Sequence, residues 1–159
     1  MVVQEGIRLW LGLSHVALNT GKWEKAEKPL KQVMTAVSPR RLVWWQPAAY
    51  YAWGLLLLAR SAGFGAEERR TAVREAHRAF QKGFQAVEAG GCPDELPLIL
   101  LQLGLTAREL EDERCWHYLE TAVQTAQQRA RFSDRQHVLQ QANIALQDAP
   151  AAHLRHLAK

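Results

Sequence analysis

Apolar residues recur at steps of three and four along most of this 159-residue chain, which is the spacing of helices with one buried face. The clearest stripe runs through Val73, Ala76, Phe80, Phe84 and Val87. Glycine and proline interrupt the pattern between stripes, as they do at helix ends. The pattern predicts seven helices and a short tail helix, over residues 4–19, 23–37, 47–62, 66–89, 94–111, 114–130, 133–148 and from Pro150 onward.

The predicted fold class is all-α. Leu and Ala, which favour helices, supply 46 of the 159 residues, whereas β-branched Ile occurs three times and no Asn-Gly or Asp-Gly hairpin turn is present. The connections between predicted helices are short, so consecutive helices should be antiparallel neighbours. A chain of this length suits a single domain spanning residues 1–159.

The uncharged stretch from Leu42 to Ala59 is long enough to be considered as a membrane span. Pro47 divides it, however, and is well placed as the first residue of a helix of about 13 residues, the length of a buried core helix. We therefore predict no membrane span. Cys92 and Cys115 form no CxxC pair and no secretory segment precedes them, which favours a reducing, cytoplasmic setting.

A shared frame connects the predicted helix pairs. In the first pair, Trp10, Leu13 and Ser14 on one helix are followed by Ala26 and Leu30 on the next. This frame resembles the tetratricopeptide repeat (TPR), a helix hairpin of about 34 residues with the pattern W-x2-L-G-x2-Y, then A-x3-F-x2-A and a proline. The resemblance is closest in this first pair.

The second and third pairs fit the frame with altered turns. Gly54 and Gly104 correspond to Ser14 as small residues that allow two helices to approach closely. The resemblance implies a TPR-like right-handed solenoid of hairpins, and an unrelated stack of α-hairpins is the alternative. The repeat-like units are expected over residues 4–39, 47–90 and 94–130, with capping helices over 133–158.

No residue pattern indicates catalysis or metal binding. None of the four serines lies in G-x-S-x-G, and there is no glycine-rich phosphate loop. Cys115 and His117 are two residues apart, so a helix would direct them to different faces. No zinc-ligand spacing links the cysteines and histidines. We predict that the protein is not an enzyme and has no catalytic residue, metal or cofactor.

The net charge of +4 permits nucleic acid as a partner without requiring it. Arginine and glutamate alternate on the polar side of the longest predicted helix, at Arg69, Arg70, Arg74 and Arg78 and at Glu67, Glu68 and Glu75. Such neighbours compensate one another, and no aromatic residue is interleaved for base stacking. Nucleic-acid binding is therefore disfavoured.

The TPR resemblance also implies a binding surface, because in that family the first helix of each hairpin lines a concave groove that holds a peptide. Carried over by position, the groove residues would be Arg8, Leu11, His15, Asn19, Tyr51, Leu55, Leu58, Leu101, Leu105 and Arg108. A groove of this composition would take an apolar segment or an amphipathic helix. The alternatives are that the chain's own tail or a second copy fills it, or that these leucines pack inside a closed bundle.

These observations predict a non-enzymatic protein–protein interaction module, a scaffold, assembly factor or adaptor, whose partner is another protein or a peptide. Self-association is a further prediction. The alternative is a regulatory helical domain of a larger signalling or transcription protein, and a basic nucleic-acid-binding helical domain is the weakest interpretation.

Overall fold

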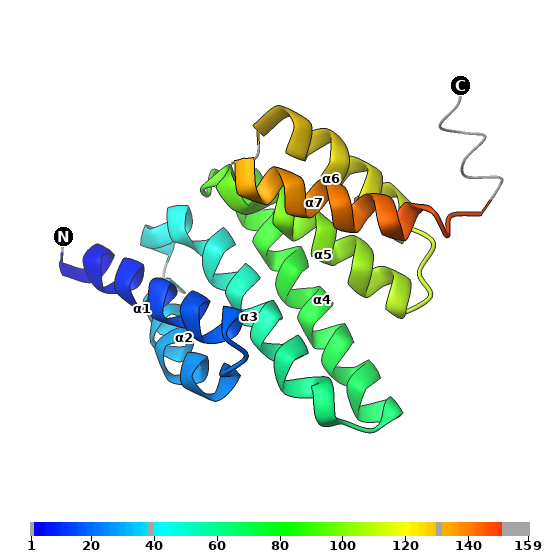
Figure 1. The fold of residues 1–159 in the computed structure, drawn as a ribbon. Helices are drawn as coiled ribbons and strands as arrows, with labels where there is room; N and C mark the ends of the chain where they lie inside the picture. Colours follow the sequence, from blue (N-terminus) through cyan, green and yellow to red (C-terminus); the bar gives the residue numbers. More distant parts are fainter. Residues whose placement is uncertain (1, 38–39, 130–131, 151–159) are drawn as a thin grey trace. The chain divides into compact units, whose positions relative to one another are not determined.

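The computed structural model describes residues 2–37, 40–129 and 132–150, and it is all-α over these residues (Figure 1). Within each of the two compact units of the chain, consecutive α-helices pack as antiparallel neighbours. The chain divides into two compact units, Met1–Glu95 and Leu96–Lys159. Among the described residues, none of the helices combines the length and the apolar character needed to cross a lipid bilayer.

Four α-helices and three short 3₁₀ helices form the first unit. Their bounds are α1 (Val2–Asn19), α2 (Trp23–Val37), η1 (Arg40–Trp45), α3 (Gln46–Arg60), η2 (Ser61–Gly63), α4 (Ala66–Glu88) and η3 (Pro93–Glu95). The second unit contains α5 (Leu96–Glu109), α6 (Cys115–Arg129) and α7 (Phe132–Leu146).

The seven predicted helices are confirmed, and the differences lie at their edges. The helix expected from Asp94 begins at Leu96, because residues 93–95 form a 3₁₀ turn ahead of Pro97. Residues 40–45, expected as a plain connection, form η1. The side-chain amide of Gln46 donates to the Val37 carbonyl at 2.9 Å, which holds this connection against the end of α2. The predicted tail helix extends into residues 151–159, outside the described part of the chain.

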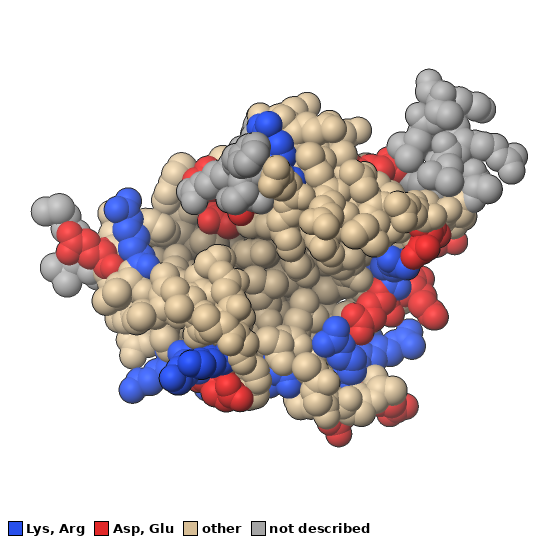
Figure 2. All heavy atoms as spheres, in the orientation of Figure 1, with Lys and Arg blue, Asp and Glu red and all other residues tan. Residues whose placement is uncertain are grey.

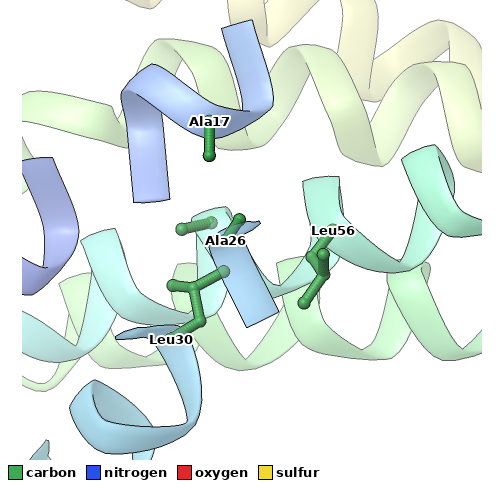
Figure 3. Packing of buried hydrophobic residues seen from close by; sticks show 5 residues of the cluster. Ala17, Ala26, Leu30 and Leu56 are labelled. Atoms are coloured by element: carbon green, nitrogen blue, oxygen red, sulfur yellow. The ribbon is translucent and has the colours of Figure 1, made fainter. Parts of the chain in front are cut away.

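Part of the core of the first unit lies where α3 packs against both helices of the α1/α2 pair. Figure 3 shows part of this core, in which Ala17 of α1, Ala26 and Leu30 of α2 and Leu56 of α3 point toward one another. A second cluster, of Ile7, Val33, Val37 and Ala49, continues the same layer. The small alanines allow close helix approach, and the leucine and valine side chains fill the space between them.

Helices α3 and α4 are in close contact at a glycine of α3. A Cβ atom built on Gly54 would lie 2.4 Å from a ring carbon of Phe80, so only a hydrogen fits between α3 and that ring. In the second unit, a Cβ on Gly104 of α5 would lie 2.6 Å from Leu119 of α6. Both close helix approaches were predicted from the sequence, and both are confirmed.

Helix α1 ends at a glycine in the left-handed region. Gly21 has φ of 73°, and the Lys22 and Gly21 amides donate to the carbonyls of Ala17 and Leu18, which is the Schellman pattern. Glu111 occupies the equivalent position after α5, with φ of 60°, and the Asp112 amide donates to the Ala107 carbonyl at 2.8 Å. One helix end therefore uses glycine, and the other holds a larger residue in the same strained conformation.

Candidate interaction surfaces

The groove residues predicted on α1 are mostly at the surface. Arg8, His15 and Asn19 are exposed, whereas Leu11 is half-buried and packs against both core clusters of the first unit. The Arg8 guanidinium lies 5.5 Å from the centre of the Trp45 ring, a cation–π distance. Only the polar members of this group are therefore accessible to a partner.

The groove residues predicted on α3 are less accessible. Tyr51 is 8% exposed, and its ring centre lies 6.1 Å from that of Phe80, so the expectation of a solvent-facing Tyr51 is corrected by its packing against α4. Leu55 and Leu58 are half-buried. The sequence held a signal for this placement, because Tyr51 is three residues before Gly54 and shares its face of the helix.

The groove residues predicted in the second unit also take part in its packing. Leu101 is fully buried and Leu105 is half-buried. The Arg108 guanidinium forms an ion pair with the Asp148 carboxylate, beyond the end of α7, and lies 6.0 Å from the centre of the Trp116 ring. Arg108 thus links the three helices of this unit.

A different apolar surface lies on α1, and the sequence interpretation missed it. Leu9, Leu13 and Val16 are 61%, 51% and 63% exposed. They are spaced by four and three residues, so they form one stripe along the helix. Leu13 was matched to the leucine of the TPR pattern, and half of its surface is open to solvent. The sequence feature that could have indicated this exposed surface is the presence of apolar residues on two faces of the same helix.

An open depression of about 920 Å³ is lined by residues of α1 and α2 in the first unit. Gly6 and Trp10 of α1 form one part of its lining. The rest comes from α2, through Glu24, Glu27, Lys28, Lys31, Gln32, Thr35 and Ala36. Gly6 exposes the Trp10 ring here, since a Cβ at position 6 would rest on that ring at 3.6 Å. The depression is therefore apolar on the α1 side and charged on the α2 side.

Lysines are concentrated on α2 and the turn before it. Four of the six lysines of the chain lie within ten residues, at Lys22, Lys25, Lys28 and Lys31, and all four are exposed. Lys31 forms an ion pair with Glu27 at 3.3 Å, and Arg60 of α3 approaches the same carboxylate at 3.7 Å. Figure 2 shows few charged atoms over most of α1, and groups of Lys and Arg atoms, with Asp or Glu atoms beside them, along the edge below α1. An apolar surface and a basic edge thus adjoin.

The cysteines show no sign of activation. Burial raises the pKa of the Cys115 thiol, and it also raises the pKa of Cys92. At Cys92 a hydrogen bond with the Asp94 backbone opposes this rise, whereas the negative charge of the Asp94 carboxylate adds to it. A raised pKa keeps a thiol protonated at neutral pH, which is the opposite of what a cysteine nucleophile needs. Among the described residues, no three His, Cys, Asp or Glu side chains gather as metal ligands would.

Comparisons of the chain with family models, with curated proteins and with solved structures found no match.

Proposed function

We propose that this protein is a non-enzymatic protein–protein interaction module of the cytoplasm, a scaffold or adaptor that binds an apolar or amphipathic segment of its partner. The exposed stripe of Leu9, Leu13 and Val16 is the observation that supports this most directly. Apolar side chains in contact with water at helical spacing are typical of surfaces that another protein covers.

Equivalent contacts in two hairpins support a TPR-like frame for the fold. Gly54 meets Phe80, and Gly104 meets Leu119, although the members of these pairs are separated by hairpin turns of different lengths. The same frame aligns Ser14 with Leu30, and both of these side chains are fully buried. A small residue on the first helix facing a large one on the second is the arrangement that the TPR pattern describes.

This proposal keeps only part of the groove that the sequence predicted on the first helix of each hairpin. Arg8, His15 and Asn19 keep their exposed side chains and can contact a partner. Tyr51 and Leu101 instead stabilise their own units. The apolar contact area that a partner needs is therefore supplied by the α1 stripe.

The test is affinity capture with the full chain from a native lysate, followed by mass spectrometry. Leu13→Ser removes an apolar anchor from α1, and Ile144→Ser removes a similarly exposed apolar side chain (54%) from α7 as a matched control. We expect the same specific protein to be captured by the wild type and by Ile144→Ser, and to be lost with Leu13→Ser. Absence of any specific captured protein would refute the proposed function.

A further inference from the structure

We infer that the free face of the α1/α2 pair binds an acidic amphipathic helix of a partner protein. This inference rests on the proposed function and specifies the chemistry of the partner. The binding face consists of the α1 stripe (Leu9, Leu13 and Val16), the exposed part of Trp10, and the lysine edge (Lys22, Lys25 and Lys28).

The α1/α2 pair already packs against one helix on its other side. Helix α3 contacts both α1 and α2, and Leu11 belongs to the core that they share. Leu9 and Leu13 are each two residues from Leu11, which is about 200° around a helix, so they lie on the opposite side of α1. Two antiparallel helices offer a groove on each side, and a helix fills one of these two grooves within the chain. We therefore expect a helix in the other.

The spacing of the stripe indicates the register of the occupant. Leu9, Leu13 and Val16 extend over eight residues, and the seven steps between the first and the last cover about 10 Å along the axis of α1. A partner helix with apolar side chains at i, i+3 or i+4, and i+7 would place its ridges against this stripe and beside the Trp10 ring. The depression next to Trp10 provides room for the largest of these side chains.

Charge indicates that the partner helix is acidic. Lys22, Lys25 and Lys28 are exposed, and none of them has an acidic partner within the described part of the chain. The carboxylate of Glu27 is already between Lys31 and Arg60, so it offers little repulsion to an incoming anion. Glu24 is also exposed along this edge, but the three lysines outnumber it and leave the edge basic. Asp or Glu flanking the apolar positions of the partner would lie opposite the lysine edge. A second copy of this chain would instead bring another lysine edge to the same face.

The test uses two synthetic helical peptides, both labelled with fluorescein and followed by fluorescence anisotropy with the full chain. Both carry Leu at i, i+3, i+4 and i+7, and one has Glu where the other has Lys. We expect the Glu peptide to bind at least tenfold more tightly than the Lys peptide, with a preference that shrinks as salt rises. Equal affinities, or no binding of the Glu peptide, would overturn the inference.

Single-residue variants test whether the Glu peptide binds to this face of the α1/α2 pair. Leu13→Ser should weaken binding of the Glu peptide at least tenfold, Lys28→Glu should reduce the preference for Glu over Lys, and Ile144→Ser should change neither. All three should retain the wild-type melting temperature, since these side chains are exposed. Binding of the Glu peptide that survives Leu13→Ser would overturn the inference.

Two further results would assign the face to another occupant. A wild-type dimer in analytical ultracentrifugation that Leu13→Ser converts to a monomer would show that a second copy covers this face. Binding to anionic phosphatidylserine vesicles that depends on Leu13, without binding of the Glu peptide, would show a lipid surface instead. If a specific protein is captured from lysate while the two peptides bind equally, the proposed function stands and this inference fails.

Discussion

Gly54 on α3 faces the ring of Phe80 on α4 so closely that any side chain at position 54 would displace the ring. The nearest ring carbons would lie 2.4 and 2.6 Å from a Cβ atom, and Phe80 is fully buried. A buried aromatic ring can move only if its neighbours move too, because protein interiors are close-packed. This contact therefore fixes the distance between the two helices.

Gly54→Ala should destabilise the first unit because the methyl group overpacks the α3/α4 crossing, and overpacking typically costs ~1–3 kcal/mol. Gly12→Ala is the matched control, since Gly12 is also inside a helix but a Cβ atom there would have no heavy atom within 4 Å. It should stabilise by ~0.5–1 kcal/mol through helix propensity alone. Chemical denaturation of both variants measures the contrast. Equal effects of the two substitutions would show that the Phe80 contact does not restrict the helix distance.

Glu111→Gly should stabilise the second unit. Glu111 is exposed and adopts a left-handed conformation, with φ of 60°, which costs a residue with a side chain roughly 1–2 kcal/mol relative to glycine. Gly21→Ala is the reciprocal change at the end of α1, where φ is 73°, and it should destabilise. Thermal melting should therefore move in opposite directions for the two variants. A lower melting temperature for Glu111→Gly would contradict this account of the helix end.

Tyr51→Glu should unfold or severely destabilise the first unit, because it replaces a buried ring with a carboxylate beside Phe80. Loss of a large buried aromatic side chain alone costs ~3–5 kcal/mol, and burial of a charge adds to this. His15→Glu places the same side chain on the exposed surface of α1 and should change stability by no more than about 0.5 kcal/mol. Thermal unfolding followed by circular dichroism compares the stabilities of the two variants. A Tyr51→Glu protein as stable as the His15→Glu protein would show that Tyr51 is open to solvent.

Cys115 should react with iodoacetamide at pH 7.5 much more slowly in the folded protein than in urea, because it is 3% exposed and its pKa is raised by burial. The raised pKa also makes stability depend on pH. Above the ordinary thiol pKa, the unfolded chain loses this proton before the folded protein does, so the free energy of unfolding falls as pH rises. Denaturation at pH 8 and pH 10 should show this fall, and Cys115→Ala should reduce it. A Cys115→Ala variant with an unchanged pH dependence would exclude the thiol as a contributor.

The sequence by itself determined the helices and the close helix contacts at Gly54 and Gly104. Periodicity and helix-ending residues such as Gly21 are local properties of the chain, so they can be recognised in the sequence without knowledge of the fold. Gly54 and Gly104 could be recognised because a small residue within an apolar helical stripe has one common use, the close approach of another helix.

Only the tertiary structure decided which side of each helix is covered. Periodicity shows which residues share a face, but it does not show which neighbour packs there, because that depends on contacts between residues far apart in sequence. Tyr51 therefore lies against Phe80 of α4 although it was expected at an open groove. Helix α1 has apolar residues on two faces, and α2 and α3 cover only the one with Ile7, Leu11 and Ala17. Leu9 and Leu13 remain in water because no described helix packs over them.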